Sequence, residues 1–83
     1  MNSISFSESF DKSFSRIKDK SVKKQIWDKI LELEDRAPIG KKLKGHPFWS
    51  VHIGKYRLVY HLESEQITIA HLLERKFEYR ELR

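Results

Sequence analysis

The chain has 83 residues, which suffices for one domain spanning residues 1–83 and leaves no room for a second. Hydrophobic residues make up 39% of the chain and aromatic residues 12%, which indicates a folded core rather than disorder. The absence of cysteine excludes disulfides and thiolate metal sites. No apolar run is long enough for a membrane span or a signal peptide, so we expect a soluble, cytoplasmic protein.

A strand is predicted at residues 3–7, where isoleucine and phenylalanine alternate with serine. A first helix follows, with Ser7 or Ser9 as its cap. Its apolar positions recur at helical spacing: Phe10, Phe14 and Ile17. Residues 19–21 interrupt this pattern and offer a cap for a second helix, which ends at the Ala-Pro-Ile-Gly segment 37–40. The apolar face of the second helix consists of Val22, Ile26, Ile30 and Leu33.

The net charge of +5 is concentrated in the next part of the chain. No aspartate or glutamate occurs between Arg36 and Leu62, and all 12 acidic residues lie outside this window. The basic residues of the window are Arg36, Lys41, Lys42, Lys44, Lys55 and Arg57. A one-sided basic surface attracts polyanions, above all phosphate backbones. A solvated basic loop is the alternative; we favour phosphate binding because strand-forming aromatic residues are interleaved with the charges.

Two strands at residues 49–53 and 56–61 are predicted to form a hairpin. Gly54 and Lys55 between them fit a two-residue type II′ turn, which favours glycine at its first central position. The resulting register places three apolar pairs on one face: Trp49 with Tyr60, Val51 with Leu58, and Ile53 with Tyr56. On the other face, His52 lies opposite Arg57 and Ser50 opposite Val59.

A last strand is predicted over residues 67–73, followed by a short helix at 74–83. Within the strand, His71 alternates with Ile67, Ile69 and Leu73, and we interpret it as a hydrogen-bonded sheet residue. The element order is therefore β-α-α-β-β-β. It indicates an α+β fold in which the N-terminal strand and a helical hairpin pack on one face of a small antiparallel sheet. The basic and polar side chains are expected on the opposite face.

The polar face carries groups that can cleave RNA without a metal. Histidine exchanges protons near neutral pH, and arginine offers a planar, permanently charged fork for phosphate. A base removes the 2′-hydroxyl proton, arginines stabilise the pentavalent phosphorane, and an acid protonates the 5′-oxygen. The candidate groups are His52, Arg57, Lys44, Arg75 and Tyr79. The competing interpretation of His52 is an exposed strand residue without chemistry. Four histidines without cysteine or HxxxH spacing predict no zinc site, and we expect no cofactor.

Three motifs carry a family resemblance. They are Leu43-Lys44-Gly45, the strand sequence WSVHIGKYRLVY at residues 49–60, and Arg75 followed four residues later by Tyr79. With the upstream helical hairpin, they make nearly the whole chain similar to the RelE/ParE superfamily of prokaryotic toxin–antitoxin pairs.

The resemblance implies a RelE-like, metal-independent endoribonuclease that cleaves messenger RNA in the ribosomal A site, with a cognate antitoxin as its partner. By position, Arg57 and Arg75 match the family's phosphate-binding arginines, and Tyr79 matches its C-terminal tyrosine. His52 stands where relatives often carry a lysine or arginine, which implies that either His52 has taken over as the base or the enzyme is weak. The expected RNA-binding and phosphate-binding residues are Lys41, Lys42, Lys44 and Lys55.

Two alternatives remain open from the sequence. The first is a ParE-like toxin that inhibits DNA gyrase without catalysis, because fold does not determine function within a superfamily. The second is a non-catalytic RNA-binding domain or toxin relic. Ser50 and His52 in place of basic residues favour the latter, as does the carboxylate of Glu74 beside the expected phosphate site.

Overall fold

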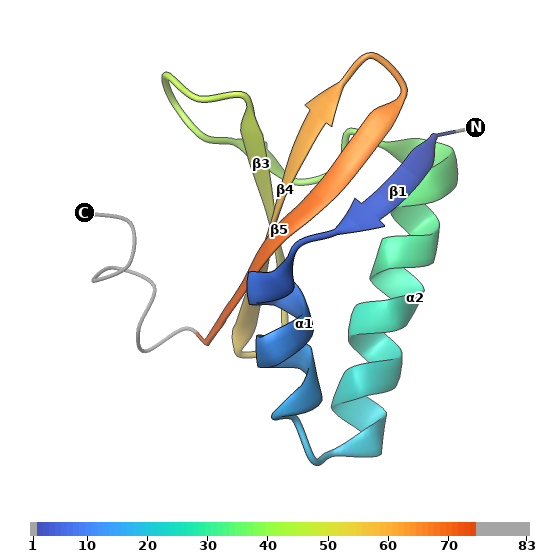
Figure 1. Ribbon diagram of the computed structural model, residues 1–83, viewed down its shortest axis with the longest axis vertical. Coiled ribbons are helices and arrows are strands. Elements are labelled where there is room, and N and C mark those ends of the chain that lie inside the picture. The colour runs from blue at the N-terminus through green and yellow to red at the C-terminus, as the bar shows by residue number, and fades with distance from the viewer. Residues whose placement is uncertain (1, 75–83) are drawn as a thin grey trace.

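The computed structural model describes residues 2–74, which form two helices and a five-stranded sheet (Figure 1). The elements in chain order are β1 (Ser3–Phe6), α1 (Glu8–Ser15), α2 (Lys20–Arg36), β2 (Lys41–Lys42), β3 (Phe48–Ile53), β4 (Tyr56–Glu63) and β5 (Gln66–Glu74). Both helices contribute to one apolar core against the inward side of the sheet. The predicted α+β fold is therefore confirmed.

The sheet has the strand order β1-β5-β4-β3-β2 and is mixed rather than wholly antiparallel. β1 pairs with β5 in parallel, whereas the other neighbours are antiparallel. The two-residue strand β2, which the sequence analysis did not assign, pairs Lys41 with Ser50 and Lys42 with Trp49. The prediction that the N-terminal strand packs on one face of an antiparallel sheet was wrong in this respect: β1 is an edge strand of the sheet itself. It pairs in parallel because the helices carry the chain back across the sheet, a connection that parallel strands need.

Both helices begin at the predicted caps. The Ser7 hydroxyl accepts a hydrogen bond from the backbone N–H of Phe10 at 3.0 Å. The Asp19 carboxylate accepts from the N–H groups of Ser21 at 2.8 Å and Val22 at 3.3 Å. These side chains satisfy amides that the first helical turn leaves without partners. α1 ends at Ser15, so Ile17 is buried just beyond the helix rather than within it.

The β3–β4 hairpin has the predicted register and turn. His52 pairs with Arg57 and Ser50 with Val59, and the three apolar pairs also form as expected. Gly54 has a φ of +59°, while Lys55 is not in the left-handed region, as a type II′ turn requires. Alternate residues therefore point inward into the core, and His52 and Arg57 point to the face that the helices leave open.

The alternation predicted for β5 was wrong beyond Ile69. The register shifts between Val59 and Tyr60, so that Val59 pairs with His71 and Tyr60 with Ile69. One extra residue in β5 changes the side on which the following residues point, and Leu72 rather than Leu73 enters the core. His71 is hydrogen-bonded, as predicted: its Nδ1 lies 3.2 Å from the Ser9 hydroxyl.

The predicted C-terminal helix lies outside the described residues, apart from Glu74 at the end of β5. Within residues 2–74, neither helix has the length and apolar character needed to cross a membrane.

Candidate functional site

An open groove of about 590 Å³ lies where β2 and the turn after it meet β3 and β4. Three amines, an imidazole and a guanidinium line it: Lys41, Lys42, Lys44, His52 and Arg57. Within residues 2–74, no carboxylate lines the groove. Its described lining therefore carries one sign of charge, which attracts a polyanion.

His52 and Arg57 are in direct contact across the hairpin. Nη2 of Arg57 lies 3.0 Å from Nε2 of His52. A guanidinium only donates hydrogen bonds, so Nε2 must be the acceptor. A ring nitrogen that accepts carries no proton, so this hydrogen bond assigns to His52 the tautomer with its proton on Nδ1.

The lysines of β2 are held beside β3 by contacts that are remote in sequence. The buried Tyr60 hydroxyl accepts from the Ile39 N–H at 2.7 Å and donates to the Ile39 carbonyl at 2.5 Å. Burial raises the pKa of Tyr60 above its ordinary value of 10.0, against a smaller opposing effect of the hydrogen bond with Ile39. Gly40 follows with a φ of +94°, and a Cβ there would lie 2.1 Å from the Ser50 carbonyl oxygen. Only glycine permits this approach.

The groove contains five of the eight residues proposed from the sequence: Lys41, Lys42, Lys44, His52 and Arg57. Lys55 lies outside it, in the β3–β4 turn, with Nζ 4.0 Å from a Glu74 carboxylate oxygen and 5.7 Å from the centre of the Tyr56 ring. Arg75 and Tyr79 lie outside the described residues.

The helix-free face also carries aromatic groups that the sequence analysis did not assign to the site. The Phe48 and His61 rings meet edge to face, with 5.4 Å between their centres. A small pocket of about 200 Å³ next to them is lined by Leu43, His46, Phe48, Val59 and His71. The alternation of Phe48 with Ser50 and His52 in β3 was the signal that could have placed Phe48 on this face. Within residues 2–74, no cluster of histidines and carboxylates is suited to hold a metal ion.

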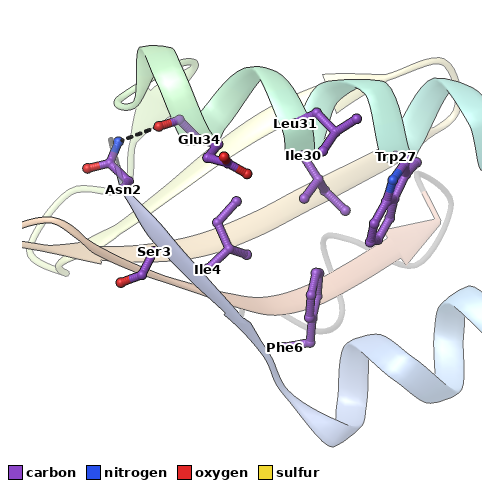
Figure 2. A pocket seen from close by; sticks show the side chains of 8 residues that line it. All are labelled: Asn2, Ser3, Ile4, Phe6, Trp27, Ile30, Leu31 and Glu34. Carbon is purple, nitrogen blue, oxygen red and sulfur yellow. Dashed lines mark hydrogen bonds between the residues drawn. The ribbon is translucent and has the colours of Figure 1, made fainter.

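A second groove, of about 510 Å³, lies between β1 and α2 and is largely apolar (Figure 2). Phe6, Trp27 and Leu31 border it and remain 39%, 42% and 47% exposed. The rings of Phe6 and Trp27 are stacked, with their centres 5.7 Å apart. At one end, the Asn2 side-chain amide donates to the Glu34 carbonyl at 3.3 Å, which ties the start of β1 to the end of α2.

The family model described as the ParE toxin of the type II toxin–antitoxin system parDE matches residues 4–79. The chain belongs to this family. It is thus a toxin of a toxin–antitoxin system within the RelE/ParE superfamily, as the sequence motifs predicted. No curated protein matches the chain in sequence.

Solved structures agree with the fold. The isolated RelE toxin of E. coli superposes with a TM-score of 0.79 at 23% identity, over 99% of this chain and 95% of that one. A chain of the RelB–RelE antitoxin–toxin complex of Methanococcus jannaschii gives 0.80 at 22%, over 95% and 99%. The chromosomal ParDE system of P. aeruginosa gives 0.74 at 12%, over 89% and 96%. At these identities the likeness establishes the fold alone.

Proposed function

We propose that this toxin is a metal-independent endoribonuclease that cuts messenger RNA on the ribosome and arrests translation. The observation that carries the proposal is the juxtaposition of His52 and Arg57 in a groove whose other charged lining residues are lysines. A proton acceptor next to a permanent cation, on a surface that attracts phosphate, matches the needs of metal-free RNA cleavage.

The residues divide into positioning and chemical roles. Lys41, Lys42 and Lys44 contact the RNA backbone and set its register. Nε2 of His52 takes the proton of a 2′-hydroxyl while that oxygen attacks the adjacent phosphorus. Arg57 stabilises the charge that develops on the phosphoryl oxygens. The bond from phosphorus to the 5′-oxygen then breaks, and the leaving oxygen takes up a proton.

Arg75 and Tyr79 enter the proposal through the resemblance to RelE-like toxins. By that resemblance, Arg75 is a second phosphate-binding group, and Tyr79 contacts a nucleobase or the scissile group. β5 ends at Glu74, whose strand partner Tyr56 precedes Arg57 in β4, and Arg75 is the next residue in the sequence.

A second function, inhibition of DNA gyrase without catalysis, is supported by the family model, which describes ParE toxins. The two functions differ in what they leave intact. A ribonuclease cuts messages and leaves gyrase working, whereas a gyrase inhibitor stops supercoiling and leaves messages whole.

The deciding experiment measures both activities with the same protein. Purified toxin is added to ribosomes stalled on a defined message, and separately to gyrase with relaxed plasmid. We expect cuts within the codon at the A site and unchanged supercoiling. Arg57→Met should slow single-turnover cleavage by about 10²–10³-fold, the usual effect of removing one transition-state donor. Arg16→Met, the same substitution at an exposed site outside the groove, should cleave at the wild-type rate. Whole messages together with blocked supercoiling would establish the gyrase function instead.

The apolar β1–α2 groove supports a cognate antitoxin as the partner of this toxin. β1 is an edge strand: the Ser3 amide donates to the Glu65 carbonyl just before β5, and the Ser7 amide just after β1 donates to the Ile69 carbonyl of β5. In a parallel ladder, the amides of Ile4 and Phe6 therefore point to the open edge. An apolar extended segment can bond to this edge while its side chains cover Phe6, Trp27 and Leu31.

Antitoxin binding is tested with the product of the adjacent gene. Its addition should raise the Tm of the toxin, because a ligand that binds only the folded state stabilises it. Trp27→Ser should weaken this shift, since Trp27 is 42% exposed and belongs to the groove. Lys24→Ser, on an exposed turn of the same helix, is the matched control. An equal increase in Tm for both variants would indicate that the antitoxin binds another surface of the toxin.

A further inference from the structure

The hydrogen bond from Arg57 occupies Nε2 of His52, the atom that takes the 2′-hydroxyl proton in the proposed reaction. Because Nδ1 carries the ring proton, Nε2 is the single basic nitrogen of His52. That nitrogen lies 3.0 Å from Nη2 of Arg57, which donates to it. A lone pair engaged in a hydrogen bond cannot accept a 2′-hydroxyl proton until the donor leaves. In the free protein, His52 is therefore a base with its acceptor site occupied.

The hydrogen bond to His52 is one that an anion can displace. It joins a cation to a neutral acceptor, and it lies in a groove that three lysines line and that no carboxylate of residues 2–74 lines. A phosphate oxygen carries negative charge, so it adds a Coulombic attraction to the guanidinium that a neutral imidazole nitrogen lacks. The planar guanidinium also fits phosphate with two parallel N–H donors, which one imidazole nitrogen cannot match.

We propose that Arg57 keeps His52 inactive as a base until a phosphate of the RNA enters the groove and draws the guanidinium away from Nε2. Arg57 then serves twice, first as a block on the base and afterwards as a phosphate ligand. The base becomes available only when the phosphate that it must serve is in place. The exchange itself follows from the contact geometry, whereas the use of the released Nε2 for cleavage rests on the proposed ribonuclease function.

The hairpin is built to permit such an exchange. His52 and Arg57 are paired residues of β3 and β4, so their backbone positions are held by the sheet while the side chains project to the open face. The imidazole is exposed, whereas Arg57 is partly buried and makes further contacts. Rotation about the Arg57 side-chain torsions can separate Nη2 from Nε2 without backbone movement, and such rotations are fast compared with chemistry.

The proton positions can be observed directly by NMR on protein labelled with ¹⁵N in its histidines. Two-bond correlations identify the protonated nitrogen of each ring and show whether the other nitrogen accepts a hydrogen bond. The probe is an RNA hexamer with 2′-O-methyl groups throughout, which presents phosphates but has no 2′-hydroxyl and cannot be cleaved. Arg57→Met retains much of the apolar stem and removes the donor, and it defines the signal of an unblocked Nε2.

In the free wild-type protein, we expect a proton on Nδ1 of His52 and a hydrogen-bonded Nε2. Saturation with the hexamer should move the Nε2 signal to the position seen in free Arg57→Met, and Arg16→Met should behave as wild type. His71 is the internal control, because its Nδ1 contacts Ser9 outside the groove and should not change.

Three results would overturn the proposal: a proton on Nε2 in the free protein, identical His52 signals in wild type and Arg57→Met, or a blocked Nε2 in the hexamer complex. Failure of the hexamer to bind at millimolar concentration would also overturn it. Changed His71 signals in Arg57→Met would indicate a perturbed fold, and the hexamer titration of the wild type then decides. If the exchange is seen but ribosome-bound messages stay whole, the ribonuclease function fails while the phosphate-driven exchange stands.

Discussion

Replacing Tyr60 by phenylalanine tests whether a buried hydroxyl holds the basic strand β2 in place. The Tyr60 side chain is 0% exposed, and its hydroxyl both accepts from and donates to the backbone of Ile39. Ile39 lies directly before Gly40 and the β2 lysines. Tyr60→Phe keeps the ring and its packing, so no cavity of ring size forms. The substitution therefore removes two hydrogen bonds and little else.

The expected loss of stability follows from those two bonds. Each contributes about 1 kcal/mol net, and the Ile39 groups left without a partner are only partly buried, so water compensates some of the cost. We expect the free energy of unfolding to fall by about 2 kcal/mol. In a domain of this size, that corresponds to a decrease in Tm of about 8–16 °C.

Urea unfolding followed by circular dichroism measures the change at pH 7. Tyr56→Phe is the matched control, because the Tyr56 hydroxyl makes no hydrogen bond to the described part of the chain; its effect should stay within about 0.5 kcal/mol. Tyr60→Phe should also weaken RNA binding, since the lysines of β2 lose their anchor. A Tyr60→Phe protein as stable as the Tyr56→Phe control would refute this account of how β2 is held.

The dependence of the free energy of unfolding on alkaline pH provides an independent check of the burial of Tyr60. Burial raises the pKa of Tyr60 in the folded protein. Above the ordinary tyrosine value of 10.0, the unfolded chain loses a phenolic proton that the folded chain retains, so stability falls as the pH rises. Tyr60→Phe lacks this group. The stability difference between wild type and variant should therefore narrow above about pH 10; a constant difference would contradict the raised pKa.

Three further predictions concern the groove and its surroundings. Gly40→Ala should lower the free energy of unfolding by more than about 2 kcal/mol, and Gly45→Ala by about 1 kcal/mol. Both glycines have a positive φ, but only a Cβ at position 40 would meet backbone atoms. Equal losses of stability for the two variants in urea unfolding would contradict this. Lys44→Ala should weaken RNA binding and make the slope of log K against log salt concentration shallower by about 0.7, while the rate of single-turnover cleavage at saturation stays unchanged. A slower chemical step would show that Lys44 does more than contact the RNA backbone. Arg75→Ala should abolish cleavage with little change in Tm, and Tyr79→Phe should lose part of the rate; an Arg75→Ala protein that stays fully toxic in cells would return both residues to a structural role.

Local patterns in the sequence sufficed to place His52 opposite Arg57. Alternation with a period of two defines the faces of β3 and β4, and a glycine at the first turn position sets the register between them. The helix caps at Ser7 and Asp19 are equally local, because each side chain bonds to an amide two or three residues away. These features depend on neighbours in the chain, so the sequence alone determined the hairpin register and the start of α2 and left Ser7 and Ser9 as the two candidate caps of α1.

Only the tertiary structure decided how the rest of the groove is assembled. β2 lies beside β3 because the Tyr60 hydroxyl binds Ile39, 21 residues earlier, and because Gly40 approaches the Ser50 carbonyl. The same holds for Lys55, which turns toward Glu74 rather than toward the groove. The physical reason is that packing and hydrogen bonds between distant segments depend on the whole fold. Local periodicity indicates which face of a helix or strand a side chain occupies, but not which distant segment that side chain contacts.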